Sequence, residues 1–204
     1  TNNCAAGLDQ PVGTQSCTSA VAGGAVGGTR VRLLKHLVVV GTGSGTNAVV
    51  RILNPDSSKL VKEFRPFPGV NKNGVKIAVG DLQGDQVGDI VVSTSAPSNP
   101  LVRIFTDKGA YVTQFNPYPA LKGTGVSVAL GDVDADGKDK LITVPDKSLG
   151  QVRIFKYSPT TKRFTTYAQF QLFPNNFRGG FSVVAEDLDL SGGAEIILAP
   201  RVSS

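Results

Sequence analysis

Val102-Arg103-Ile104-Phe105 is the segment that decides the fold, because the chain repeats it. An earlier copy is Val50-Arg51-Ile52-Leu53 and a later one is Val152-Arg153-Ile154-Phe155, at spacings of 52 and 50 residues. Apolar side chains that alternate with a charged one are typical of a half-buried β-strand. A strand that returns about every fifty residues predicts an all-β repeat protein.

Two other segments recur in the same phase and indicate true internal repeats. An aromatic–proline segment occupies residues 64–68, 115–119 and 170–174, where the sequence reads FRPFP, FNPYP and FQLFP. A glycine-led apolar segment occupies residues 74–79, 125–130 and 180–185, where the sequence reads GVKIAV, GVSVAL and GFSVVA.

Each unit reads as four short strands. Within residues 125–179 we expect strands over 126–130, 141–144, 151–157 and 163–170, separated by Gly-, Pro- and Asp-rich turns. Four strands in about fifty residues are typical of one β-propeller blade, a sheet that must pack on neighbouring sheets around an axis.

We therefore expect an all-β fold, a β-propeller of four-stranded blades, with about three and a half blades in residues 31–204. The predicted units are a partial blade 37–70, the blades 74–123 and 125–179, and a partial blade 180–204. Closed propellers typically have at least four blades. We therefore expect that another copy of the chain, or sequence missing from it, completes the ring.

Residues 1–30 differ from the repeats and read as a small-residue arm. The arm holds the two cysteines of the chain, Cys4 and Cys17, and we expect them to form a disulfide in an oxidising compartment. The alternative is a pair of free thiols. The chain has no Met, so we expect a processed or excised form. It has no run of eighteen apolar residues, so the sequence does not predict a membrane span.

The basic balance of the chain does not predict a nucleic-acid partner. The formal net charge is +5, but Lys and Arg occur mostly as scattered single residues and never in a run of five. A nucleic-acid surface would interleave clustered basic residues with stacking aromatics on one strand face.

Carboxylates cluster at each turn between the first and second strand of a unit, in residues 80–89, 131–140 and 186–195. Oxygen ligands at alternate positions around a tight turn suit Ca²⁺ better than Mg²⁺, which demands a stricter octahedron. The alternative is a set of acidic β-turns without metal. The candidate ligands are Asp81, Gln83, Asp85 and Asp89 in the first loop, Asp132, Asp134 and Asp136 in the middle loop, and Asp187, Asp189, Ser191 and Glu195 in the last.

These loops, set between apolar strands of a fifty-residue repeat, resemble the FG-GAP repeat of integrin α-subunit propellers. The resemblance covers about residues 37–204 and implies calcium ligands at loop positions one, three, five and nine, with a main-chain carbonyl at seven. The sequence departs from that pattern at Gln86, where the family has the glycine of position six, and at Lys140, where it has a carboxylate. We expect that Lys140 could fold over the middle carboxylates and replace the cation.

Catalytic patterns are missing, so we expect no enzyme. His36 is the only histidine, and no nucleophile elbow accompanies it. The glycine-rich residues 41–46 lack the Gly-Lys-Ser/Thr of a phosphate loop. Paired carboxylates for glycoside hydrolysis could be drawn from the acidic loops, but turn or metal roles explain them better.

The recurring aromatic residues fall into two groups, one predicted to lie in the core and one predicted to lie on the surface. We expect Phe105, Phe115, Phe155 and Phe170 in the core between blades. The proline-flanked Phe67, Tyr118 and Phe173 are the candidates for a ligand or partner surface.

The sequence predicts a secreted or cell-surface calcium-binding module for adhesion, recognition or self-assembly, with a protein or glycan ligand. The alternatives are a carbohydrate-binding lectin and the accessory propeller of a secreted polysaccharide-degrading enzyme.

Overall fold

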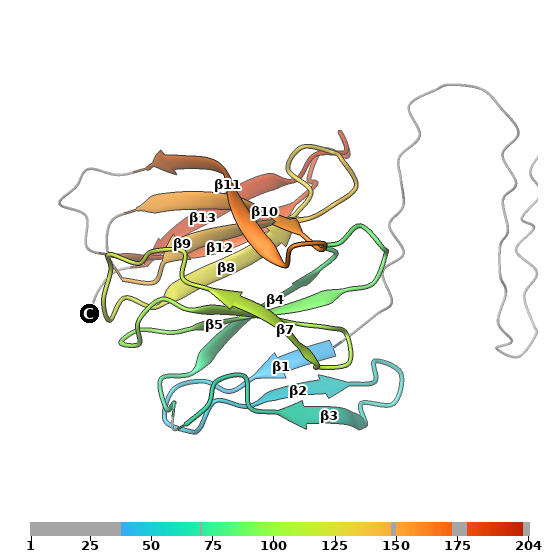
Figure 1. The fold of residues 1–204 in the computed structure, drawn as a ribbon, viewed down its shortest axis with the longest axis vertical. Helices are drawn as coiled ribbons and strands as arrows, with labels where there is room; N and C mark the ends of the chain where they lie inside the picture. The colour runs from blue at the N-terminus through green and yellow to red at the C-terminus, as the bar shows by residue number, and fades with distance from the viewer. Residues whose placement is uncertain (1–37, 70, 148–149, 173–178, 202–204) are drawn as a thin grey trace, which may run out of the picture.

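The computed structural model describes residues 38–69, 71–147, 150–172 and 179–201, and every regular element in them is a β-strand. The all-β prediction is therefore confirmed (Figure 1). The described residues contain no helix with the length and apolar character that a membrane crossing requires.

Thirteen described strands form four antiparallel sheets, each built from strands that follow one another in the chain. Sheet 1 contains β1 (Val38–Gly41), β2 (Val50–Leu53) and β3 (Leu60–Phe64). Sheet 2 contains β4 (Val75–Gly80), β5 (Asp89–Thr94), β6 (Val102–Phe105) and β7 (Tyr111–Phe115). Sheet 3 contains β8 (Val126–Gly131), β9 (Lys140–Pro145), β10 (Gln151–Ser158) and β11 (Arg163–Gln171). Sheet 4 contains β12 (Gly180–Glu186) and β13 (Glu195–Arg201).

The strands predicted within residues 125–179 are confirmed to within one or two residues at each end. The repeated Val-Arg-Ile segment forms the third strand of sheet 3 (β10) and of sheet 2 (β6), and also forms β2. A register shift follows its isoleucine each time, at Ile52/Leu53, Ile104/Phe105 and Ile154/Phe155. The extra residue of each β-bulge lies on the neighbouring outer strand, at Val61, Val112 and Tyr167.

The sheets pack face to face through three apolar clusters, one between each successive pair. Val102 and Ile104 of sheet 2 are buried in a cluster with Leu141 of sheet 3, whereas Phe105, which the alternation along β6 places on the opposite face, packs with Val50 toward sheet 1. Both faces of the inner two sheets are thus buried, as expected for sheets that cannot bury their own faces alone.

The first strands of sheets 2, 3 and 4 lie side by side along the row. β4 contacts β8, β8 contacts β12, and β1 contacts β4. Sheet 1 packs on sheet 2 and sheet 4 packs on sheet 3, and none of the apolar clusters of the described residues joins sheet 1 to sheet 4. Figure 1 shows sheet 1 at the end of the molecule away from sheets 3 and 4. Two sets of loops result, one at each end of these inner strands, and the acidic loops belong to one set.

Candidate functional site

The three acidic loops have one backbone conformation. Loop positions four and six have positive φ in every copy, with values of 79°, 55° and 60° at position four and 65°, 86° and 98° at position six. The residues are Gly84, Ala135 and Leu190 at position four, and Gln86, Gly137 and Gly192 at position six. In each copy the position-six N–H donates to the position-one carboxylate, at 2.7 to 3.0 Å. The turn therefore forms whether or not position six is glycine.

The first loop satisfies its carboxylates with its own hydrogen bonds. Asp81 is buried and accepts from the backbone N–H groups of Gly84, Asp85 and Gln86. The Gln83 amide donates to Asp89 Oδ1 at 3.1 Å. Burial raises the pKa of Asp89 to about 6, against the lowering by that amide and the Leu82 N–H. These carboxylates do not belong to the groups whose oxygens converge on one point.

Asp139 ties the middle loop to the first. Its Oδ2 accepts from the Asp81 N–H at 2.6 Å, and its own N–H donates to the Asp81 carbonyl at 2.8 Å. Asp139 therefore joins the middle loop to the start of the first loop.

In the middle loop the Lys140 ammonium occupies the centre of the carboxylate cluster. Its Nζ contacts Asp132 Oδ1 at 3.1 Å, Asp136 Oδ1 at 2.5 Å and Asp134 Oδ1, and it donates to the Lys138 carbonyl at 2.8 Å. These groups stand at positions one, five, three and seven, where the FG-GAP resemblance implies calcium ligands. Lys140 is 1% exposed. Lys140 thus folds over the middle carboxylates, as expected from the sequence, whereas its replacement of a cation stays a prediction.

The pKa values of this cluster follow from the ion pairs. Burial raises the pKa of Asp134, but hydrogen bonds from Lys140 and Lys156 outweigh it and lower the value to about 2. Burial likewise opposes the charge of Lys140, yet its three carboxylate partners hold its pKa above the ordinary range. Asp134 and Lys140 are thus both charged at neutral pH.

The last loop has the converging carboxylates without a lysine at position nine. Oxygens of Asp187, Asp189 and Glu195 lie within 4.8 Å of one another. Asp187 Oδ2 accepts from the Gly192 N–H, while its Oδ1 is buried and has no hydrogen-bond partner in the part of the chain that the structure describes. Glu195 Oε2 accepts from the Leu188 N–H at 2.8 Å, and Ser191 lowers the pKa of Asp189 by hydrogen bonding. Among the described loops, this one suits a hard cation best.

A polar cluster that sequence reasoning missed lies at the opposite end of the inner strands. Lys76 of β4 donates to Ser127 Oγ of β8 at 2.7 Å and pairs with Asp146, which follows β9. Arg201 of β13 pairs with the same carboxylate, so three sheets meet at one anion. Burial, and secondarily Arg201, lower the pKa of Lys76 to about 7. The partners are far apart in sequence, so no local pattern could have indicated the cluster.

The prediction that Phe67 and Tyr118 form a ligand surface is wrong, because both are buried. The Tyr118 hydroxyl lies 2.8 Å from the Thr143 carbonyl, and the Arg153 guanidinium covers the ring at 5.0 Å. Phe67 is covered in the same way by Arg103. Phe105 and Phe155 are buried as predicted, but Phe170 is exposed on β11, so that part of the core prediction is wrong.

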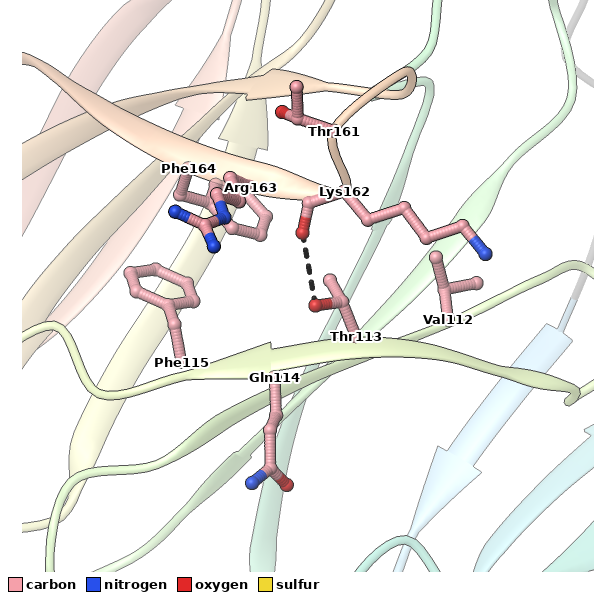
Figure 2. Close-up of a pocket in the computed structure, with 8 residues that line it drawn as sticks. All are labelled: Val112, Thr113, Gln114, Phe115, Thr161, Lys162, Arg163 and Phe164. Atoms are coloured by element: carbon pink, nitrogen blue, oxygen red, sulfur yellow. Dashed lines mark hydrogen bonds between the residues drawn. The ribbon is translucent and has the colours of Figure 1, made fainter.

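The outer strands β7 and β11 enclose a groove of about 420 Å³ between sheets 2 and 3 (Figure 2). The Thr113 hydroxyl donates to the Lys162 carbonyl at 3.1 Å across it. The rings of Phe115 and Phe164 stack at 4.4 Å, and Arg163 lines the same groove. Two stacked rings beside hydroxyl and guanidinium groups can contact the apolar and polar faces of a sugar.

Four predicted features lie outside the described residues: the Cys4–Cys17 disulfide, the arm that contains it, His36 and Phe173.

No family model and no curated protein sequence matches this chain. Solved structures that resemble it include the exotype rhamnogalacturonan lyase YesX, with 13% identity, a TM-score of 0.53 and coverage of 76% of this chain. A rhamnogalacturonan lyase of Bacillus licheniformis gives 15% identity and the same TM-score and coverage. The chain spans about a third of either lyase, 33% and 34%. At these identities the likeness concerns the fold, an all-β arrangement of successive antiparallel sheets.

Proposed function

We propose that this chain is a segment of a β-propeller and acts as an extracellular recognition or scaffold module, for adhesion or self-assembly, without catalysis of its own. The packing of the sheets carries the proposal. The inner strands β4, β8 and β12 lie side by side, and each sheet buries the same kind of apolar face against the next. A repeat that continues this packing around an axis forms a propeller.

The chemistry of the described residues favours binding over catalysis. Lys76 and Ser127 form the one Lys–Ser pair among them that could resemble a nucleophile with its base. The Ser127 hydroxyl is buried and donates to the Phe181 carbonyl at 2.7 Å, so a substrate would not reach it. The middle-loop carboxylates are each paired with Lys140.

Calcium in the last loop is part of the proposal. It is supported by the three converging carboxylates and by the buried Asp187 Oδ1 without a partner. Such a cation would stiffen the β12–β13 turn and stabilise the folded state. Calorimetric titration with CaCl₂ should give saturable binding that Asp187→Asn abolishes, while Asp85→Asn in the first loop leaves it unchanged.

Electron microscopy of the purified chain tests the propeller directly. We expect ring-shaped particles with a central axis, formed by association of copies. Linear stacks of sheets or separate two-sheet sandwiches would contradict the proposal.

A second candidate is the accessory propeller of a polysaccharide-degrading enzyme. It is favoured by the two rhamnogalacturonan lyases that share the fold and by the groove between β7 and β11. It predicts that the chain binds soluble rhamnogalacturonan without shortening it. Affinity electrophoresis measures the binding, and a reducing-end assay measures cleavage. Loss of binding in Arg163→Ala, but not in Lys108→Ala, would locate the sugar in the groove.

A further inference from the structure

Within residues 38–69, sheet 1 contains no strand at the position that the other sheets place innermost. Residues 37–53 align with residues 89–105 without a gap, so β1 corresponds to β5, the second strand of sheet 2. In sheet 2 the inner strand β4 pairs with β5, and in sheet 3 β8 pairs with β9. β1 pairs with β2 alone among the described strands. Its inner edge therefore presents unpaired backbone groups, which are a template for an added strand.

The free face of sheet 1 has the apolar pattern of faces that are buried elsewhere. Val38 and Val40 are 42% and 48% exposed. Their equivalents Ile90 and Val92 in sheet 2 are both 0% exposed, because sheet 1 packs on them. The face of sheet 1 that carries Val38 and Val40 thus has the composition of an interface without its partner.

An arginine clamp repeats at two of the three internal interfaces, between sheets 1 and 2 and between sheets 2 and 3. Arg103 bonds Gln114 across the sheet through Nε, and its Nη1 donates to the Pro66 carbonyl in the connector from the preceding sheet. Arg153 donates to the Pro117 carbonyl of the next connector at 2.7 Å. Each guanidinium also covers the aromatic ring that follows the proline. The clamp therefore recognises an aromatic–proline connector by its carbonyl and its ring.

Arg51 is the copy of this clamp in sheet 1. Its Nε bonds Glu63 Oε2 at 2.7 Å, in the same way as Arg103 bonds Gln114. No connector carbonyl among the described residues bonds its terminal nitrogens, and its side chain is 58% exposed. The terminal guanidinium nitrogens of Arg51 can therefore donate to a further connector carbonyl, as those of Arg103 and Arg153 donate to the Pro66 and Pro117 carbonyls.

We propose that the open edge of β1, the Val38–Val40 face and Arg51 form a docking site for one kind of segment: an aromatic–proline connector followed by a glycine-led inner strand, supplied by a further repeat of the same pattern. The inference rests on the proposed propeller. The connector carbonyl binds Arg51, and the strand pairs antiparallel with β1. By equivalence with the β8–β9 register, Val128 of such a segment would lie opposite Val40 and Leu130 opposite Val38.

A synthetic peptide of residues 115–131, FNPYPALKGTGVSVALG, tests the site on the full-length chain. We expect saturable binding by fluorescence anisotropy, and slower hydrogen exchange at Val38–Val40 when the peptide is bound. Arg51→Ala should weaken binding about tenfold, because a charge-assisted hydrogen bond is lost. Lys108→Ala, which removes an exposed charge elsewhere, should leave the affinity unchanged.

A second peptide with Val128→Pro removes one ladder hydrogen bond and should not bind. Equal binding of the two peptides, or no protection at β1, would overturn the docking site. Rings in the microscope together with a peptide that does not bind would contradict this inference and leave the proposed function standing. If the peptide binds but the chain forms linear stacks in the microscope, the docking site is supported and the proposed propeller is contradicted.

Discussion

A lysine ammonium lies among the carboxylates of the middle acidic loop. Lys140 Nζ reaches three carboxylates and a main-chain carbonyl, the same kinds of oxygen that Ca²⁺ prefers. A tethered ammonium supplies one positive charge at every calcium concentration. The three loops thus share a backbone but differ in how their negative charge is compensated: by internal hydrogen bonds, by a lysine, and in our proposal by calcium.

Lys140→Ser should make the middle loop dependent on calcium. Removing one partner of a buried ion cluster typically costs about 3–5 kcal/mol, so we expect a large loss of stability in EDTA. Added CaCl₂ should restore most of it by binding the vacated carboxylates. Lys138→Ser, in the same loop, should change little. Thermal melts with and without calcium measure both variants, and a Lys140→Ser melt that equals wild type in EDTA would refute the role of the ammonium.

Gln86 adopts a left-handed backbone, with φ of 65°, where the other loops have glycine. Such a conformation costs a side-chain-bearing residue about 1–2 kcal/mol. Gln86→Gly should therefore raise the free energy of unfolding by up to about 1 kcal/mol after the added flexibility of the unfolded chain is counted. Gly137→Ala should lower it by a similar amount. Urea denaturation measures both, and a destabilised Gln86→Gly variant would show that the amide has another role.

At the scale of elements, the polar cluster of Lys76, Asp146 and Arg201 joins strands from three sheets at the end remote from the acidic loops. Two cations share one carboxylate, and Ser127 accepts from Lys76. The excess positive charge and the burial explain why the pKa of Lys76 falls in spite of its ion pair.

This pKa gives stability a defined pH dependence. The pKa of Lys76 is about 7 in the folded protein, whereas its ordinary value, which we expect in the unfolded chain, is 10.5. Between those two values the folded state binds fewer protons than the unfolded state, so the free energy of unfolding should rise as pH increases from about 7 toward 10. Lys76→Met should flatten that rise, which urea denaturation across the pH range measures. An identical slope in the variant would assign the dependence to another group.

The strands could be predicted from the sequence because alternation and a fifty-residue spacing are local signals. The burial of Phe67 and Tyr118 could not, since proline-flanked aromatics resemble exposed loops until the arginine of the next sheet covers them. The position of the Lys140 ammonium among the middle-loop carboxylates could be anticipated, because Lys140 stands at loop position nine, where the FG-GAP pattern has a carboxylate. The Lys76 cluster could not, because a contact across about seventy residues leaves no local pattern.

At the scale of the whole molecule, both ends of the row expose apolar side chains. Val38 and Val40 lie on sheet 1, and Val184 and Ile197 on sheet 4. Burying such faces is favourable by about 25 cal/mol per Å² of apolar surface. An open row of sheets is thus expected to associate.

Light scattering should give a mass that rises above 21.3 kDa with concentration. Val40→Lys places a charge on the free face of sheet 1 and should shift the chain toward the monomer. Val87→Lys, in an exposed loop, serves as the control. A strictly monomeric wild-type chain at high concentration would argue against completion of the ring by another copy.

The equivalence of the interfaces on the two sides of sheet 2 has a consequence for how such a chain can change in length over evolution. A duplicated unit inserted between sheets 2 and 3 would meet an apolar face on one side, an arginine partner on the other, and an Asp139-like residue to fasten its turn. Whole units can therefore be gained or lost by recombination without changes in their neighbours. A gain of half a unit would leave an apolar sheet face in the interior without a packing partner.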